Sequence, residues 1–471
     1  MGYLFSEEKF IASFNAKSPE EKSADSMRLT HKPDGAFKLF PYKASGKTQA
    51  PIVMNLEDIV SDFFREIQGK KTEPVNYDSL CEAILEEVEI KDEDLDYFKG
   101  MLQSLFFVGN DFVANNLALY PYQTVSNNKS AENLAHFLYS VLGVSSEDYD
   151  AVETAKDQYR FNVLEDMIIQ TMENKKVSES ETREPYYSIK TDIQKKFRDD
   201  FRFMLDMGMT SLEDFSNLFS VYYFYYVSQT CITLDRFCDG KRDDTVEFYY
   251  ALDWEKVSKN RMCCVSGWDR LQVSINHMFS HAITLEIINQ TDTDTKWDYI
   301  AFREYLEQFP DEDHQIAEEI TRAEDLYCSY VGDYKRFNEI GYYEAASTET
   351  EKAIRHLFKC VEAQFLETER KRANQFYNEK YSDFCKYRWV KNRKKSGLVL
   401  NLTERDIIFL TKISLRNEEK IRLNDLYKEY EYRGIYLDNS SKEYLQEFFT
   451  KLNLIDKKSD SGDAQYVKRI L

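Results

Sequence analysis

Apolar residues recur at helical spacing through most of the chain after residue 55. Leu56, Ile59, Val60 and Phe63 begin the first such stripe, because positions three and four residues apart share one face of a helix. Similar stripes predict helices over residues 78–89, 92–109, 130–142, 149–173, 189–288, 297–309 and 313–335. Glycine (15) and proline (8) are scarce for 471 residues, which favours long helices. The predicted fold class is mainly α, with a multi-helical body.

The same pattern divides the chain into five segments. A polar stretch over residues 174–186 predicts a linker or exposed loop. Ser347 or Thr348, followed by acids, predicts the start of a long helix, and the apolar residues that follow are consistent with one or two helices. The predicted segments are an irregular N-terminal segment (1–55), an N-terminal helical domain (56–180), a central helical domain (181–345), a long helix with a basic end (346–395) and a winged-helix-like domain (396–471).

The last segment has the clearest boundaries. Thr403 and Asp406 predict a helix N-terminus, the apolar positions from Leu423 to Tyr430 predict a second helix, and Gly434 predicts its end. Ser440 and Glu443 have the spacing of a capping box for a third helix. A turn over residues 459–463 then separates two strand-like runs. Helix–helix–helix–hairpin is the order of a winged helix, which predicts a C-terminal winged-helix-like domain.

One uncharged run, from Phe215 to Leu234, has the length of a membrane span. It contains seven Ser, Thr, Asn or Gln residues and the sequence Tyr-Tyr-Phe-Tyr-Tyr. This polarity favours a helix buried in protein over one in a bilayer. We therefore expect no membrane contact. The eight cysteines form no CxxC pair and no signal peptide opens the sequence, so we expect a reducing, cytoplasmic location.

Charge is unevenly distributed along the chain. The net charge is −21, yet residues 386–471 contain 19 Lys and Arg against 13 Asp and Glu, whereas residues 1–385 contain 43 against 70. An acidic body repels phosphate backbones, so contact with DNA requires a local basic surface. The C-terminal segment offers one, and DNA is the partner that this charge pattern predicts.

Basic and aromatic side chains alternate just before the winged-helix-like segment, where cations can neutralise phosphates and rings can stack on bases. The predicted nucleic-acid-binding residues there and on the wing are Lys386, Arg388, Trp389, Lys391, Arg393, Lys394, Lys395, Lys457, Lys458, Lys468 and Arg469. The alternative is a solvated helix terminus beside a protein-docking module. The third helix is not strongly basic, and Asp438 and Glu443 would lie near phosphates, so base reading is not expected.

Candidates for catalysis are weak. Residues 41–48 imitate a phosphate-binding loop, but its first glycine is missing and Pro51 interrupts the helix that should follow. His277 and His281 stand four residues apart near Glu286 and several cysteines, yet without the spacing of a metal motif. We therefore predict no catalytic residue, no cofactor and no metal. A metal-dependent nuclease with a cryptic carboxylate site remains an alternative, as does a protein-docking scaffold without DNA contact.

The run Tyr432–Leu471, and above all the sequence KKSDSGDAQYV from Lys457 to Val467, resembles the C-terminal signature of the DptG proteins of phosphorothioation-dependent DNA restriction. The resemblance implies a role in bacterial defence against phage, in a complex that attacks DNA lacking a sulfur-modified backbone. It also implies two partners, an F-type ATPase and an H-type helicase-like ATPase. It carries over no catalytic residue. Together with the basic segment, it indicates a DNA-associated accessory subunit.

Overall fold

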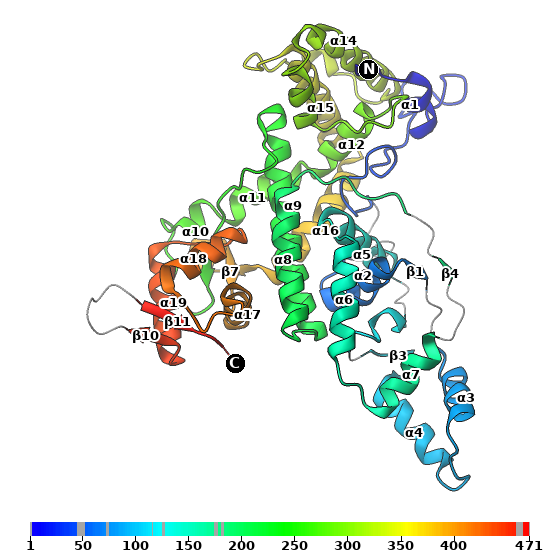
Figure 1. The fold of residues 1–471 in the computed structure, drawn as a ribbon. Coiled ribbons are helices and arrows are strands. Elements are labelled where there is room, and N and C mark those ends of the chain that lie inside the picture. Colours follow the sequence, from blue (N-terminus) through cyan, green and yellow to red (C-terminus); the bar gives the residue numbers. More distant parts are fainter. Residues whose placement is uncertain are drawn as a thin grey trace.

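The computed structural model describes residues 2–44, 52–71, 75–114, 116–124, 128–173, 178–179, 183–457 and 465–470. Within these residues the fold is mainly helical, as predicted. The end of the phosphate-loop-like sequence (45–48), Lys458 and the turn over residues 459–463 lie outside the described residues. Figure 1 shows a central long helix, with the N-terminal helices on one side of it and the C-terminal segment on the other.

The described residues of the N-terminal part of the chain are mainly helical, with two short two-stranded pairings and two short 3-10 helices (η). Its helices and strands are α1 Glu7–Ser13, η1 Leu56–Ile59, α2 Val60–Gln68, β1 Lys70–Lys71, α3 Tyr77–Glu87, α4 Leu95–Phe106, β2 Phe107–Val108, β3 Asp111–Phe112, η2 Tyr120–Tyr122, α5 Lys129–Val141, α6 Ser146–Gln158, α7 Val163–Glu173 and β4 Ser178–Glu179. β1 pairs with β4, and β2 with β3. The segment before residue 56 is less irregular than predicted, because it contains α1 and buries Phe37 and Leu39 in the core.

The central helix is α9, Leu212–Asp235, which contains the uncharged run. It begins at a capping box made by Ser211 and Asp214. Its tyrosines are buried, but their hydroxyls have partners: Tyr222 donates to Asp200 (2.7 Å) and Tyr223 bonds to Tyr42 (2.7 Å). Satisfied hydroxyls allow a polar helix to be buried in protein. None of the described helices has the length and apolar character that crossing a bilayer requires.

Helices around α9 complete the body. They are α8 Asp192–Asp206, η3 Phe237–Asp239, α10 Met262–Val265, α11 Trp268–Asn276, α12 Met278–Ile288, α13 Tyr299–Leu306, η4 Pro310–Glu312, α14 Asp313–Tyr330, η5 Phe337–Glu339, α15 Glu349–Glu367 and α16 Lys371–Arg388. The segment over residues 346–395, predicted as a long helix or as two, contains two helices, because α15 ends at Glu367 and α16 begins after Arg370. Of the two predicted caps, Ser347 and Thr348, the structure has Thr348, whose side chain accepts from the Glu351 N–H.

The C-terminal segment contains three helices and six short strands. They are β6 Val390–Asn392, η6 Lys394–Ser396, β7 Leu398–Leu402, α17 Glu404–Leu415, β8 Lys420–Arg422, α18 Leu423–Tyr432, β9 Tyr436–Leu437, α19 Asn439–Lys451, β10 Ile455–Lys457 and β11 Gln465–Lys468. β8, β10 and β11 form an antiparallel sheet in the order β10–β11–β8. The predicted cap at Thr403 is confirmed, but α19 is capped by Asp438 rather than by Ser440.

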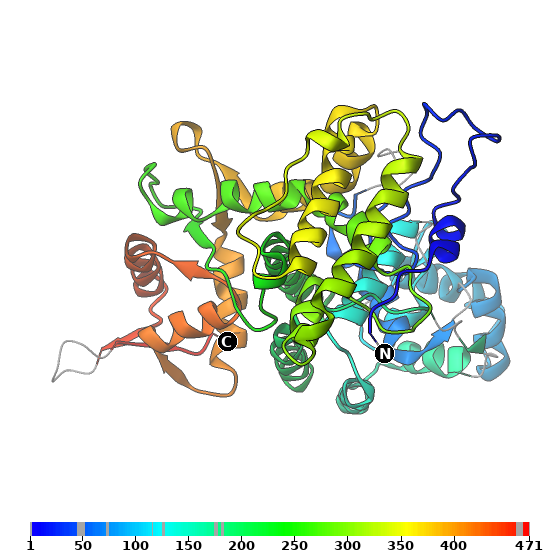
Figure 2. The ribbon, with the colours of Figure 1, turned by 90° about the horizontal axis from the view of Figure 1, so that it is seen from above.

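A strand of the body joins the C-terminal segment to the rest of the molecule. β5, Tyr249–Leu252, lies between β7 and β9 and is parallel to both. Gly434, with φ +78°, brings the chain against α9 so closely that a Cβ there would lie 2.4 Å from the Tyr225 ring. One hydrophobic cluster includes residues from every part of the chain. Seen from above, the N-terminal helices and the C-terminal segment occupy opposite ends of this continuous body (Figure 2).

Candidate functional site

The predicted basic segment, Lys386–Lys395, spans the end of α16, strand β6 and the turn η6. β6 pairs antiparallel with β7 in the sheet that contains β5. The wing residues Lys457, Lys468 and Arg469 belong to or follow the separate β10–β11–β8 sheet. The predicted contacts therefore come from two sheets of the C-terminal segment.

Arg388 and Trp389 are held inside the protein. Arg388 forms an ion pair with Asp406, and its guanidinium carbon lies 4.2 Å from the centroid of the Trp389 ring. Trp389 is 1% exposed and packs against Phe224 and Tyr250, with ring centroids 5.7 and 6.2 Å away. The prediction that Trp389 stacks on a base does not fit this structure, because neither ring face reaches solvent.

Arg393 is also used within the fold. Its guanidinium donates to the Leu252 carbonyl (2.6 Å), the Glu255 carbonyl (3.2 Å) and Asn401 Oδ1 (2.7 Å). These acceptors lie at the end of β5, just after it, and in β7, so Arg393 links the two inner strands of the sheet. Lys391 forms an ion pair with Asp253 in the same place. Both residues were predicted to bind phosphates, but their cations already have acceptors in the chain.

Several of the other predicted cations reach the surface. Lys394 and Lys395 are exposed in η6, and Arg469 is exposed after β11. Lys468 is half-buried, and Lys386 lies 3.7 Å from Asp383 with 46% of its side chain exposed. Lys457 lies in β10. The structure thus separates the predicted set into cations that stabilise the fold and cations that remain accessible to phosphates.

Lys386 and His277, which belong to two separate predictions from the sequence, both line one polar groove. The groove has a volume of about 520 Å³ and lies between α11, α15 and α16. Its lining residues are mainly amides, with two lysines, two glutamates and a histidine: Gln272, Asn276, His277, Glu362, Leu366, Lys371, Asn374, Gln375, Asn378, Glu379, Ser382 and Lys386. A groove of this polarity can hold an ionic or hydrogen-bonding ligand.

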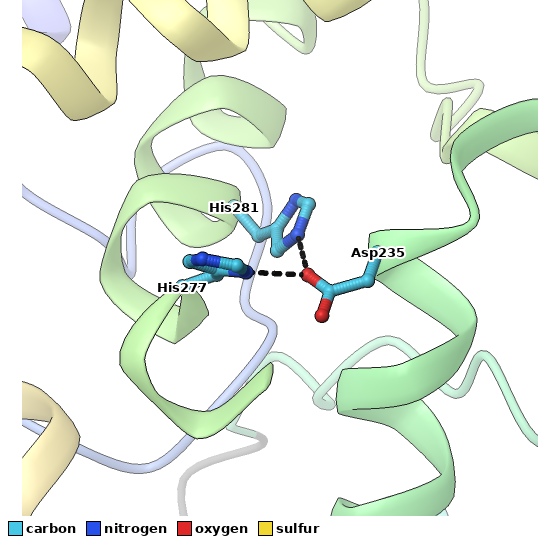
Figure 3. A group of neighbouring side chains, drawn as sticks. All are labelled: Asp235, His277 and His281. Carbon is cyan, nitrogen blue, oxygen red and sulfur yellow. Dashed lines mark hydrogen bonds and ion pairs between the residues drawn. The ribbon is translucent and has the colours of Figure 1, made fainter. Parts of the chain in front are cut away.

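A histidine–aspartate centre lies beside this groove. His277, at the junction of α11 and α12, and His281, one turn later, both project toward Asp235 at the end of α9 (Figure 3). Asp235 Oδ1 lies 2.9 Å from His277 Nδ1 and 3.0 Å from His281 Nε2. The other ring nitrogens also have partners: His277 Nε2 lies 3.5 Å from Glu362, and His281 Nδ1 lies 3.0 Å from the Tyr299 hydroxyl.

The surroundings shift the pKa values of Asp235, His277, His281 and Glu362. Burial raises the pKa of Asp235, but the hydrogen bonds from His277 and His281 outweigh it and hold that pKa below its usual range. The hydrogen bond to Asp235 raises the pKa of His277, whereas complete burial lowers the pKa of His281. Burial also raises the pKa of Glu362. These shifts favour the ionised form of Asp235, the protonated form of His277 and the neutral form of His281.

The same atoms can hold a metal ion. Asp235, His277 and His281 offer ligand atoms that all lie within 4.8 Å of one another, and two histidines with one carboxylate suit Fe²⁺, Mn²⁺ or Zn²⁺. Glu362 and Tyr299 would orient the histidines from behind, as partners of metal-bound imidazoles commonly do. His277 also lines the groove, so a further coordination position would face a ligand there. Without a metal, the hydrogen bonds alone satisfy the cluster.

The spacing of His277 and His281 was visible in the sequence, but the Asp235 carboxylate that contacts them was not. Glu286 was the acid considered beside them, and it instead accepts the N–H groups of Ala36 (2.7 Å) and Phe37 (2.9 Å). Asp235 carried one signal: an acid in the last turn of a helix opposes the helix dipole and therefore needs cationic or hydrogen-bonding partners. Cys263 and Cys264 lie in α10, away from this centre, and pack against the β5–β7 sheet.

Comparison with known proteins gives neither a matching family model nor a matching curated protein.

Proposed function

We propose that the protein is a non-catalytic accessory subunit of a bacterial phosphorothioation-dependent DNA restriction complex, acting in the cytoplasm. The observation that carries the proposal is the order α17–β8–α18–β9–α19–β10–β11, with the sheet order β10–β11–β8. Apart from β9, which pairs with β5, this order resembles that of a winged helix, a module that docks on DNA or proteins. The resemblance of Tyr432–Leu471 to the DptG signature supports the specific complex.

The proposed DNA contact uses phosphates rather than base edges. Among the predicted cations around the C-terminal segment, Lys394, Lys395 and Arg469 are exposed and Lys468 is half-buried. On α19, which corresponds to the recognition helix of a winged helix, Lys442 lies 3.5 Å from Glu431 and over the Tyr427 ring. Backbone contacts position a protein on DNA without reading its sequence. The acidic body then faces away from DNA.

The proposed protein partners are the F-type and H-type ATPases of the complex. Their presence can be tested by expressing an affinity-tagged chain from its own operon and analysing what co-purifies under mild salt. The proposal expects both ATPases to be recovered with the chain. Recovery of the chain alone, from cells that contain both ATPases, would contradict the subunit role. Recovery of the ATPases by a chain that binds no DNA would favour a docking scaffold.

A second candidate function, a metal-dependent nuclease subunit, is favoured by the Asp235–His277–His281 centre and its groove. Lys371 and Lys386 line that groove and offer positive charge for a phosphodiester, while a metal at the centre would activate water for its hydrolysis. Purified full-length protein should then nick supercoiled plasmid with Mn²⁺, and His281→Gln should abolish nicking. Intact plasmid with Mn²⁺, Mg²⁺ and Zn²⁺ would leave the non-catalytic role as the better account.

A further inference from the structure

Two pairs of potential metal ligands face each other between α14 and α15, at a site distinct from the Asp235 centre. Glu324 and Cys328 lie four residues apart on α14, and His356 and Cys360 lie four residues apart on α15. Residues at this spacing share one face of a helix. Cysteine, histidine and glutamate are all ligands of zinc.

The two helices run in the same direction, so equivalent turns meet. At their N-terminal ends, the Asp313 carboxylate accepts from the N–H groups of Glu349 and Thr350, both at 2.9 Å. Figure 1 shows α14 and α15 side by side at the end of the molecule nearest the N-terminus. The parallel arrangement places Glu324 opposite His356 and Cys328 near Cys360. The ligand atoms of Glu324, His356 and Cys360 all lie within 4.8 Å of one another, and Cys328 lies close to Cys360.

The distances within the cluster are close to those of a metal site. His356 Nδ1 lies 2.7 Å from Glu324 Oε1 and 3.9 Å from Cys360 Sγ. The thiols of Cys328 and Cys360 lie close enough to shift each other's pKa. Ligand atoms around a tetrahedral zinc ion are roughly 3.3–3.8 Å apart, given the usual Zn–N and Zn–S bond lengths. To accept an ion, the Glu324–His356 separation must widen and Cys328 must approach the group formed by Glu324, His356 and Cys360.

The hydrogen bond on the far side of His356 prepares the ring for coordination. His356 Nε2 lies 3.0 Å from the Ile340 carbonyl, which can only accept, so Nε2 carries a proton. In the neutral ring Nδ1 then presents a lone pair to Glu324, which also presents lone pairs. Two groups that both present lone pairs repel each other. The contact between His356 and Glu324 is therefore stable only when one of the two carries a proton or when a metal ion lies between them. A backbone carbonyl behind the ring is a common partner of metal-bound histidine.

Three of the four proposed ligands are buried, and Cys328 is half-buried. Glu324, His356 and Cys360 are 8%, 6% and 0% exposed. The Tyr342 ring stacks on His356 with a centroid distance of 3.9 Å, so the segment after η5 covers the cluster. A closed site with four protein ligands has no position for a substrate and is typical of structural zinc. Two thiolates also disfavour Mg²⁺ and Ca²⁺.

We propose that Glu324, Cys328, His356 and Cys360 form a structural zinc site that joins α14, α15 and the segment over residues 337–343. The bound ion would replace the contacts between these side chains with bonds to a common centre. Because a structural ion binds the folded chain only, its binding energy adds to the stability of this part of the body. The site is independent of the proposed DNA contact.

Metal analysis of the full-length protein, purified without chelators, tests this site. We expect about one zinc per chain, and we expect Cys360→Ser and His356→Gln each to lose it. Cys81→Ser, which removes a buried thiol elsewhere, should keep the zinc. His281→Gln should also keep it, which separates this site from the Asp235 centre. Zinc that survives both Cys360→Ser and His356→Gln would overturn the proposal.

Cobalt substitution of the wild-type chain provides a second readout that requires no variant to fold. Co²⁺ bound here should give thiolate-to-metal charge-transfer bands and the intense visible absorption of a tetrahedral site. Chelation of the native ion should lower the unfolding temperature. Either absence of the thiolate bands, or a Cys328–Cys360 disulfide in protein purified under reducing conditions, would contradict a zinc site.

Discussion

The guanidinium of Arg433 and the carboxylate of Asp200 form a bidentate ion pair in which both side chains are fully buried. Arg433 Nε and Nη2 each lie 2.6 Å from an Asp200 oxygen. Tyr222 donates to the same carboxylate. Asp200 belongs to α8 and Arg433 follows α18, so the pair holds the C-terminal segment against the body.

Breaking this pair should strongly destabilise the protein. Arg433→Met removes the bidentate partner of the buried Asp200 carboxylate and leaves it with the more distant Arg416, whose Nη2 lies 3.5 Å away. Breaking a buried ion pair costs about 3–5 kcal/mol of unfolding free energy. The exposed pair of Arg405 and Glu213, 3.6 Å apart, provides a matched control, and Arg405→Met should change stability by under about 1 kcal/mol. Urea denaturation measures both. Equal, small effects of the two substitutions would contradict the anchoring role of Arg433.

Asp438 should make the stability of the C-terminal segment depend on acid pH. Burial raises its pKa, but hydrogen bonds from Arg261 (2.7 Å, to each oxygen) and the Ser441 N–H lower it below the unfolded value of 3.8. A lowered carboxyl pKa stabilises the fold above pH 3.8, and this contribution disappears as pH falls through the folded pKa. The pair therefore contributes fully at neutral pH.

Asp438→Asn isolates this contribution, because asparagine still caps α19 but carries no charge. At pH 7 the substitution should cost about 1.5–3 kcal/mol, the range for hydrogen bonds to charged groups. The difference from wild type should shrink as pH falls below 3.8. Unfolding free energies from pH 7 to pH 3 measure it, with Glu447→Gln, an exposed carboxyl on α19, as the control. A difference that does not change with pH would show that Arg261 does not act through the Asp438 charge.

Arg393 should affect stability rather than DNA affinity. Arg393→Ala leaves the buried acceptors of Leu252 and Asn401 without their donor, at a cost of roughly 1–3 kcal/mol. The neighbouring double substitution Lys394→Ala/Lys395→Ala, in exposed positions, should leave stability nearly unchanged. Thermal unfolding distinguishes the two. Loss of DNA binding in a fully stable Arg393→Ala protein would return Arg393 to the set of DNA contacts.

The helices were predictable where local chemistry determines them. The capping residues Thr348 and Thr403, and the apolar spacing from Leu423 to Tyr430, act over a few residues and are readable from the chain. The insertion of β5 between β7 and β9 was not readable, because parallel pairing joins strands far apart in sequence. The cap of α19 at Asp438 was missed since Ser440 and Glu443 offered the more familiar spacing.

The candidate sites likewise depend on contacts between residues far apart in the sequence. A cluster of basic residues predicts charge, but not whether carbonyls or carboxylates of distant segments lie within reach. Arg393 therefore looked like a phosphate contact, although β5 and β7 supply its acceptors. The i, i+4 pair His277 and His281 was visible in the sequence, whereas Asp235 joins them only through the packing of α9 on α12. The cluster of Cys360 and His356 likewise depends on which helix lies beside α15.

The DNA contact is the claim on which the proposed function depends most. The full-length chain is the appropriate material, because β5 and the Asp200–Arg433 pair build the C-terminal segment into the body. Two charge-reversed variants, Lys394→Glu/Lys395→Glu and Lys468→Glu/Arg469→Glu, replace the four cations proposed to contact phosphates with glutamate. Lys32→Glu/Lys91→Glu makes the same change in charge at exposed positions of the acidic body.

The most direct measurement is the salt dependence of duplex DNA affinity for these four proteins, read by fluorescence anisotropy. Each phosphate contact contributes about 0.9 to the slope of log affinity against log salt concentration. Both C-terminal variants should bind more weakly and lose up to about 2 in slope, whereas the body variant should keep the wild-type slope. Wild-type slope and affinity in all three variants would contradict a DNA contact through the C-terminal segment.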